Sequence, residues 1–287
     1  MNDSISFLVL ATVLLRPCCA VLGDELVRGA SSTAKVTVYL LAGQSNMVGS
    51  GTPIKDLPAA LRAPQSDVRF YYAGCPGKLK KNAWVSLQPG GSFDFGPEIT
   101  FGRGIADSLP QERIALIKYA TGNTNLAENW NPDTGPMYQG FKSTVEAALK
   151  SLVDREAKYQ IAGMVWMQGE SDAYFEKMAM QYETHLTNFI ARVRHDFNTP
   201  QLPLVIGRIF PGSGTSSNIP FAKTVRAAQV AVAERDSRIV WVDLDGLPQQ
   251  DAGVEFNGPG TIEMGRRFAA AMKALHGLAD QLRPGNK

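Results

Sequence analysis

Apolar, strand-like segments alternate with segments of helical periodicity along most of this chain, and this alternation limits the possible folds more than any other feature. None of the apolar segments alternates cleanly between apolar and polar residues, which is typical of strands buried on both faces. Strand and helix follow one another about five times, which predicts an open parallel sheet covered by helices. The expected strands are 36–42, 114–120, 161–167, 202–209 and 239–244, and the expected helices are 97–109, 138–153, 175–197, 220–234 and 259–275.

The length of the chain suits one domain with a continuous core, since it has 287 residues, of which 44% are hydrophobic. Two smaller domains are the alternative, but no internal repeat, long linker or low-complexity tract divides the sequence. We therefore expect a single domain over residues 35–276. A further strand is expected at 68–73, within an irregular stretch rich in glycine and proline.

The formal net charge of +2 gives no electrostatic reason to expect a nucleic acid or an anionic membrane surface as a partner. A neutral or modestly charged ligand fits this charge better. The composition carries no signature of the oligomeric state.

The N-terminus has the pattern of a secretory signal peptide over residues 1–20. Its apolar stretch at 5–15 is too short to span a bilayer, and small residues up to Ala20 follow it. Because no Lys or Arg precedes the stretch, a retained N-terminal anchor is the alternative. Cleavage would give a secreted or periplasmic protein without a stable membrane span. It would leave Cys75 as the only cysteine, which excludes an intrachain disulfide and a cysteine-based metal cluster.

Polar, glycine-bearing segments follow four of the expected strands. Ligands of an open parallel sheet bind outside the carboxyl ends of its strands, so these segments should meet at one edge and form the site. The segments are GQSN (43–46), TGNTNLAENW (121–130), QGESD (168–172) and DGLPQQDAGVEFNG (245–258).

Ser45 is the candidate nucleophile in the first of these segments. A serine directly after a buried strand has its hydroxyl at the sheet edge, with backbone N–H groups nearby that can hold an oxyanion. Most serines in such positions are helix caps or turn residues. The segment is also not the G-x-S-x-G elbow of α/β-hydrolases, because Met47 holds the final glycine position.

The second and third segments, 121–130 and 168–172, add candidate donors and carboxylates. Gly122 and Asn123 can offer backbone N–H groups to a developing negative charge, and the Gln168 amide can offer another. A glycine turn and an internally bonded glutamine explain the same residues. Glu170 and Asp172 can hold a base or a sugar hydroxyl, but acidic residues are equally expected at the start of the helix that follows.

Several motifs in this order resemble the sialate O-acetylesterase-like domain of the SGNH hydrolases, which is related to carbohydrate esterases that remove acetyl groups from sugars. The resemblance runs from about residue 36 to 272. The motifs that carry it are GQSNM, FGPEITFGRGIA (95–106), G-x-T-x-L-A-x-x-W (122–130), WMQGESD (166–172) and GVEFNGPGTIEMGRRFA (253–269).

This resemblance implies a flavodoxin-like three-layer α/β/α fold with a central parallel sheet of about five strands, and an acetylated carbohydrate as substrate. Ser45 would attack the acetyl carbonyl. The oxyanion would be held by the Ser45 N–H, by an N–H of Gly122 or Asn123, and by the Gln168 amide. The residues expected to bind substrate are Gln44, Asn46, Glu170 and, as a stacking surface for sugar rings, Trp130.

The sequence departs from this family at the catalytic histidine and aspartate. Relatives typically read D-G-[LV]-H-F, in which the histidine takes the serine proton and the aspartate orients it. Here Glu255 stands at the histidine position and Ala252 at the aspartate position. The nearest carboxylate, Asp251, lies one residue earlier.

No histidine elsewhere is an evident substitute. His185 and His195 flank the apolar stripe of the helix expected at 175–197 and should face solvent, whereas His276 follows the last expected helix, away from the site. Glu255, assisted by Asp251, is then the remaining base. A carboxylate with an ordinary pKa of about 4.3 is weak for this role unless burial raises its pKa.

Two functions therefore remain open from the sequence. One is an acetylesterase with Glu255 as a substitute base, and the other is a carbohydrate-binding pseudoenzyme that has lost the chemistry. A third hypothesis is a metal-dependent hydrolase that uses carboxylates of the last two segments. The spacing of these residues demands neither a metal nor another cofactor.

Overall fold

The computed structural model describes residues 35–73, 82–90, 94–155, 157–211, 219–251 and 254–281, without the side chains of 278–281. These residues belong to one unit, 32–287. The expected signal peptide at 1–20, Cys75 and Ala252 lie outside the described residues.

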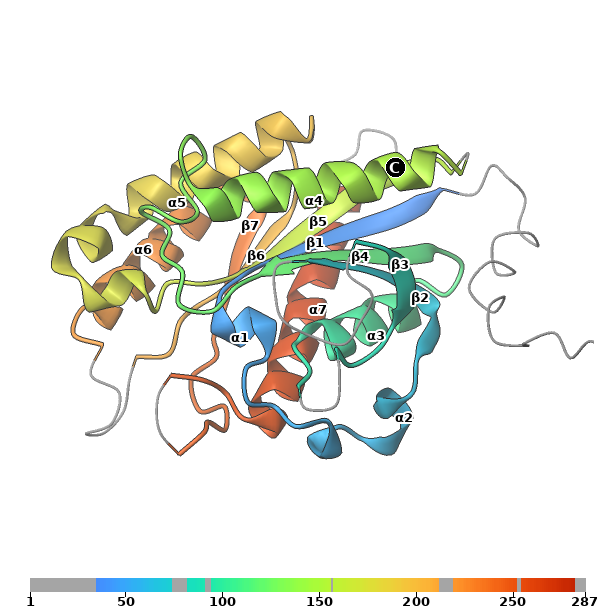
Figure 1. Cartoon of the computed structure of the whole chain (residues 1–287). Helices are drawn as coiled ribbons and strands as arrows, with labels where there is room; N and C mark the ends of the chain where they lie inside the picture. Colours follow the sequence, from blue (N-terminus) through green and yellow to red (C-terminus); the bar gives the residue numbers. More distant parts are fainter. Residues whose placement is uncertain are drawn as a thin grey trace, which may run out of the picture. The chain divides into compact units, whose positions relative to one another are not determined.

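A seven-stranded sheet forms the centre of this unit, in the order β3-β2-β4-β1-β5-β6-β7 (Figure 1). All neighbouring strands pair in parallel except β2 and β3, which are antiparallel. The strands are β1 (Val36–Gly43), β2 (Gln65–Ala73), β3 (Trp84–Leu87), β4 (Arg113–Ala120), β5 (Tyr159–Met167), β6 (Leu204–Gly207) and β7 (Ile239–Val242).

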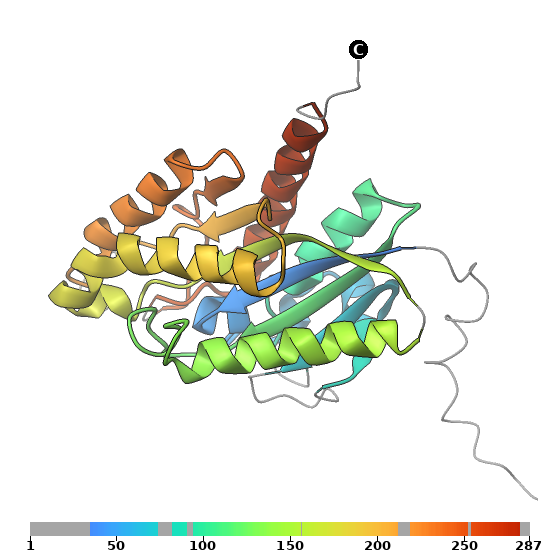
Figure 2. The ribbon, with the colours of Figure 1, turned by 90° about the horizontal axis from the view of Figure 1, so that it is seen from above.

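Helices cover both faces of the sheet. Figure 1 shows α4 and α5 on one side and α3 and α7 on the other, and Figure 2 shows α4 and α5 in front of the strands. The predicted three-layer α/β/α class is therefore confirmed. The long helices are α3 (Glu98–Ser108), α4 (Pro136–Val153), α5 (Glu176–Asp196), α6 (Ala222–Glu234) and α7 (Gly258–Gln281), and the short ones are α1 (Ser45–Val48), η2 (Ile54–Asp56), α2 (Ala59–Arg62) and η3 (Asp172–Tyr174).

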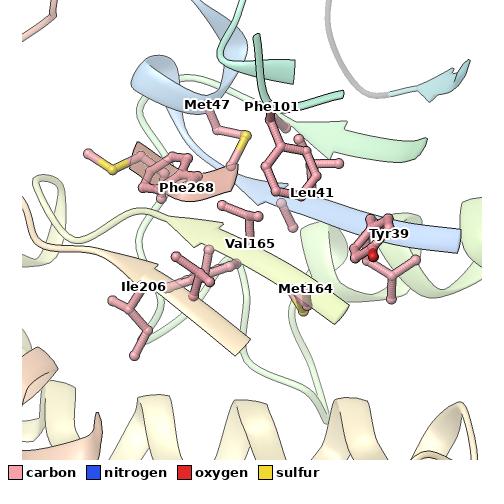
Figure 3. Close-up of a cluster of buried hydrophobic side chains, with 14 of the residues drawn as sticks. Tyr39, Leu41, Met47, Phe101, Met164, Val165, Ile206 and Phe268 are labelled. Carbon is pink, nitrogen blue, oxygen red and sulfur yellow. The ribbon is translucent and has the colours of Figure 1, made fainter. Parts of the chain in front are cut away.

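The core between the sheet and the α3–α7 pair consists of large apolar side chains. Tyr39 and Leu41 of β1 meet Phe101 of α3 and Phe268 of α7 in this layer (Figure 3), and all four are fully buried. The Tyr39 and Phe101 rings pack edge to face, with centroids 5.7 Å apart. Apolar strands that are buried on both faces in this way explain the absence of polar alternation in the sequence.

Three strands end level at the edge of the sheet where the site is expected. β1 lies between β4 and β5, and its last residue, Gly43, is in register with Ala120 of β4 and with Met167 of β5. The segments that begin at Gln44, Thr121 and Gln168 therefore leave the sheet side by side.

A Gly43→Ala substitution is expected to lower the free energy of unfolding by about 3 kcal/mol or more. Gly43 has φ +152°, and an added Cβ would lie 1.9 Å from the Met167 carbonyl oxygen, so the two strands would have to separate. Urea unfolding measures the loss. In the matched variant Gly277→Ala, the added Cβ has no neighbour within 4 Å, and stability should be equal or higher by about 0.5–1 kcal/mol. Equal losses in the two variants would contradict this view of Gly43.

Candidate functional site

Ser45 is the first residue of α1, directly beyond the end of β1. Its side chain is 5% exposed, and its Oγ has no hydrogen-bond partner among the described residues. The first turn of a helix leaves its backbone N–H groups without intrahelical partners. Ser45 therefore combines an uncommitted hydroxyl with nearby N–H donors, as a nucleophile beside an oxyanion site requires.

Gly122 lies next to Ser45, as predicted from the strand ends. A Cβ added to Gly122 would be 3.7 Å from the Ser45 Cβ, so the two backbones are in close approach. Asn123 follows with φ +57° and an exposed side chain, a left-handed conformation that asparagine tolerates. The structure thus brings the serine together with the glycine turn that was expected to hold an oxyanion.

The side chains on either side of Ser45 join its turn to the loop after β5. Gln44 Oε1 accepts from the N–H groups of Gly169 at 3.5 Å and Ser171 at 3.3 Å. Asn46 Nδ2 donates to Glu170 Oε1 at 2.7 Å. Two three-residue segments, 44–46 and 169–171, are therefore joined by hydrogen bonds. The side chains that make these bonds from the first segment are those of Gln44 and Asn46, the neighbours of Ser45.

Asn46 also holds the segment that contains Glu255. Its Nδ2 donates to the Val254 carbonyl at 3.0 Å, and its Oδ1 accepts from the Phe256 N–H at 3.0 Å. Gln44 and Asn46 are only 2% and 3% exposed. The prediction that Asn46 binds substrate is wrong, because both of its amide hydrogens and its oxygen are engaged within the protein. Gln44 Oε1 is engaged in the same way, with the N–H groups of Gly169 and Ser171.

Gln168 is bonded internally as well. Its Nε2 lies 2.6 Å from Asp172 Oδ2, 3.0 Å from the Thr124 carbonyl and 3.2 Å from Gln44 Oε1, and its side chain is fully buried. An amide nitrogen has only two hydrogens. The predicted oxyanion role of Gln168 is therefore not supported, and its observed role is to connect three loops.

Trp130 has a different environment from the predicted sugar-stacking surface. Its side chain is fully buried, and its Nε1 donates to Thr124 Oγ1 at 2.9 Å. The edges and faces of its ring pack against other aromatic rings, including Trp166 with centroids 5.1 Å apart. A ring without exposed surface cannot stack on a sugar, so this prediction is wrong and Trp130 is a core residue.

Glu255 and Asp251 lie in the segment before α7, where Gln249 and Phe256 form an isolated antiparallel bridge. Glu255 is half-buried, and its Oε2 accepts from the Val254 N–H at 3.2 Å. The backbone N–H of Gln250 donates to the Glu255 carbonyl at 3.0 Å. Asp251 is exposed and has no hydrogen bond or ion pair with another described residue. The structure thus places Glu255 near the site but gives Asp251 no contact through which to orient it.

The three histidines have other surroundings. His195 is exposed and lies 3.0 Å from Asp196, whereas His185 is half-buried, which corrects the expectation that it faces solvent, and burial lowers its pKa. His276 lies within α7, which continues past the predicted end, and its Nε2 is 3.1 Å from the Ala162 carbonyl. No hydrogen bond joins any of them to Ser45 within the described ranges.

Two buried carboxyl groups have raised pKa values. Burial, and then the negative charges of Glu255 and Asp172, raise the pKa of Glu170 to about 7, although its hydrogen bond from Asn46 acts in the opposite direction. Burial raises the pKa of Asp172 to about 6, against hydrogen bonds from the N–H groups of Leu126 and Ala127. A carboxyl group with a pKa of about 7 can take up or release a proton near neutral pH, and burial gives Glu170 this property.

The free energy of unfolding is expected to fall as pH rises from about 4.5 to about 7. In this range the folded protein holds a proton on Glu170 that the unfolded chain has released, so proton linkage favours unfolding with rising pH. Asp172 adds to the same trend up to about pH 6. Urea unfolding across pH should show a shallower dependence for Glu170→Gln and an unchanged one for the exposed Glu176→Gln. Equal slopes for all three proteins would contradict the assignment.

Among the described residues, no three His, Cys, Asp or Glu side chains gather in a way that could hold a metal ion. In the same part of the chain, none of the helices combines the length and the apolar character needed to cross a bilayer.

The chain is similar in sequence to known carbohydrate esterases. The sequence model of the family described as "carbohydrate esterase, sialic acid-specific acetylesterase" matches residues 35–274. A probable carbohydrate esterase of Arabidopsis thaliana is 28% identical over 248 residues, which are 82% of this chain and 89% of the plant protein.

Solved structures share the fold. The X-ray structure of the same Arabidopsis protein superposes with a TM-score of 0.68 at 24% identity, over 83% of this chain and 98% of that one. NanS gives 0.62 at 17% identity over 88% and 100% of the two chains. A carbohydrate acetylesterase from Xanthomonas citri gives 0.58 at 16% identity over 83% and 56%.

Proposed function

The chain belongs to the carbohydrate esterase, sialic acid-specific acetylesterase family, and on this premise we propose that it is a serine hydrolase that removes acetyl groups from acetylated sugars or polysaccharide. The observation that carries the proposal is the position of Ser45. Its Oγ has no hydrogen-bond partner among the described residues. Ser45 lies where β4, β1 and β5 end at the same edge of the sheet, beside the Gly122 backbone.

The proposed reaction begins with attack of Ser45 Oγ on the acetyl carbonyl carbon. Negative charge then develops on the carbonyl oxygen, and the N–H groups of Ser45 and of Gly122 or Asn123 are the donors that would hold it. Collapse releases the sugar hydroxyl and leaves acetyl-Ser45, which water hydrolyses to acetate. The proton transfers need a base, and the position of the family histidine offers Glu255.

A carbohydrate-binding pseudoenzyme of the same fold is the second candidate. The observation that favours it is the composition of the site, because Glu255 stands where relatives have histidine and no described residue hydrogen-bonds Ser45 Oγ. Loss of a triad member commonly lowers the rate by several powers of ten, although an oxyanion site still gives residual catalysis.

The proposal places the mature protein outside the cytoplasm, secreted or periplasmic, as a single domain that follows a cleaved signal peptide at 1–20. N-terminal sequencing of the protein from its producing cells tests this directly. A new terminus near residue 21 supports it, and an intact Met1 contradicts it.

The function is tested by incubating the mature protein with 4-nitrophenyl acetate, acetylated xylan and O-acetylated sialic acid and measuring acetate. Release from a carbohydrate substrate, together with a fluorophosphonate adduct located at Ser45 by mass spectrometry, supports the esterase. Binding of an acetylated carbohydrate in calorimetry, without acetate release or a Ser45 adduct, supports the pseudoenzyme instead.

A further inference from the structure

We propose that Asp172 is a positioning residue of this site. Its carboxylate holds the loop after β4, residues 121–130, in the conformation that places the Gly122 backbone beside Ser45. The inference rests on the proposed function, because the N–H groups of this loop are among the donors that would hold the oxyanion of that reaction. It gives a role to a fully buried carboxyl group that the proposed reaction does not otherwise use.

The Asp172 carboxylate binds this loop through both of its oxygens. Oδ2 accepts from the Leu126 N–H at 2.8 Å, and Oδ1 accepts from the Ala127 N–H at 3.1 Å. A charged acceptor makes stronger hydrogen bonds than a neutral one. Because Asp172 begins η3, in the segment after β5, one side chain joins the loop after β4 to the loop after β5.

A second connection lies closer to the expected oxyanion donors. Gln168 Nε2 lies 2.6 Å from Asp172 Oδ2 and 3.0 Å from the Thr124 carbonyl oxygen. The Thr124 hydroxyl in turn donates to the Thr121 carbonyl at 2.8 Å, across the turn that contains Gly122. The carboxylate therefore also fixes, through Gln168, the amide that holds this turn.

The turn is held on both of its sides. Before it, the Thr121 N–H donates to the Gly43 carbonyl at 3.2 Å, and beyond it the carboxylate binds the next N–H groups of the loop. Between these points, Gly122 lies against Ser45, and Asn123 has φ +57°. Such a left-handed conformation is unfavourable for most residues other than glycine and persists where the surroundings hold it.

The burial of this carboxylate is costly and indicates a use for it. A buried charge is tolerated only when hydrogen bonds compensate for the lost water, and here the compensating donors belong to the loop and to Gln168. An ionised carboxylate only accepts hydrogen bonds, and its two oxygens can take several at once. An oxyanion site requires donors that are in place before the charge develops. The Asp172 carboxylate meets this need by holding the loop in advance of the reaction.

Protonation of Asp172 gives a readout of this role. Burial raises its pKa to about 6, against the hydrogen bonds from Leu126 and Gln168, and its charge in turn raises the pKa of Glu170 and of Tyr182. A protonated carboxyl group has one oxygen fewer that is free to accept an N–H. The loop should therefore loosen, and kcat should fall, as pH decreases below about 6.

The test compares the parent protein with Asp172→Asn and with the control Tyr138→Phe, using 4-nitrophenyl acetate. At about pH 8 the parent carboxyl group is ionised, and Asp172→Asn should have a kcat about 10²-fold lower, as for reacting groups displaced by about 1 Å, with a smaller effect on KM. At about pH 5 the difference should narrow, because the parent carboxyl group is then itself protonated. Tyr138→Phe removes a 3.0 Å hydrogen bond to the Asp196 carboxylate, between α4 and α5. It should lower the stability and keep the parent kcat.

Amide hydrogen exchange, followed by mass spectrometry, measures the loop itself and does not depend on catalysis. In Asp172→Asn the amides of residues 122–124 should exchange about tenfold or more faster than in the parent protein, whereas Tyr138→Phe should leave them unchanged. Asp172→Ser keeps one acceptor oxygen in a smaller side chain, and it should give the same result if Asp172→Asn does not fold. Equal exchange and equal kcat in the parent protein and the folded variant overturn the inference.

Failure of the proposed function gives a different result. If the parent protein releases no acetate, but residues 122–124 exchange faster in Asp172→Asn, the restraint of the loop is supported and the acetylesterase is contradicted. If the parent protein releases acetate, and Asp172→Asn keeps its kcat although the loop exchanges faster, the restraint does not serve the oxyanion site. That outcome overturns the inference and leaves the proposed function intact.

Discussion

Replacement of Ser45 by alanine is expected to lower acetate release by about 10³-fold or more, because the variant has no atom that can form the acetyl intermediate. The fold should be unaffected, since Ser45 Oγ makes no hydrogen bond that alanine would lose among the described residues. Initial rates of acetate release, with thermal unfolding as a check on folding, measure the two effects separately. The exposed Ser143→Ala on α4 is the matched serine control and should keep the parent rate.

A parent protein and a Ser45→Ala variant with equal rates would remove Ser45 from the mechanism. If both are silent, the double variant Ala252→Asp, Glu255→His tests whether only the base is missing. Asn46 holds the backbone on both sides of residue 255, so a histidine there would be presented beside the site. Acetate release by the double variant would show a working pocket in a protein that has lost its catalytic base, as the pseudoenzyme hypothesis requires.

Replacement of Lys118 by methionine is expected to lower the free energy of unfolding by about 3–5 kcal/mol, because it leaves the Glu98 carboxylate buried without its partner. The Lys118 and Glu98 side chains are 2% and 4% exposed, and Nζ lies 2.6 Å from Oε2. Lys118 Nζ also donates to the Val48 carbonyl at 3.2 Å, at the end of the short helix that carries Ser45. Urea unfolding measures the loss, and a reduced rate of acetate release should accompany it.

The double variant Glu98→Gln, Lys118→Met should lose less stability than Lys118→Met alone, because it leaves no unpaired charge. The exposed pair Lys150–Asp154 has a comparable 2.6 Å separation on the surface of α4, and Lys150→Met should cost within about 0.5 kcal/mol. A similar cost for the buried and the exposed lysine would show that burial of the Lys118–Glu98 pair does not carry the effect.

The main elements of the fold could be predicted from the sequence because their signals are local. Apolar runs and helical periodicity located all five principal strands and all five long helices, with errors of a few residues at the ends. Strand β3 was missed, since its four residues pair antiparallel at the edge of the sheet and follow a glycine-rich stretch without a clear pattern. The end of α7 was also placed too early, which put His276 outside the helix.

The site could be predicted only in part. The proximity of Ser45 and Gly122 follows from the position of both residues just beyond parallel strands, and the register of those strands brings them together. The roles of Trp130, Gln168 and Asn46 did not follow, because motif position says nothing about whether a side chain is already bonded or covered inside the protein.

Local periodicity and the order of the motifs were thus enough to predict the layered sheet and the family, and they also led to the proposal of Ser45 as the nucleophile. The hydrogen bonding and the burial of each polar group in the site depended on residues far away in the sequence. Asn46 and Glu170 are 124 residues apart, and their bond exists only because β1 and β5 are neighbours. Burial by these distant segments raises the pKa of Glu170 and leaves its second oxygen unpaired. Such burial arises from tertiary packing, since desolvation depends on everything that surrounds a group in space.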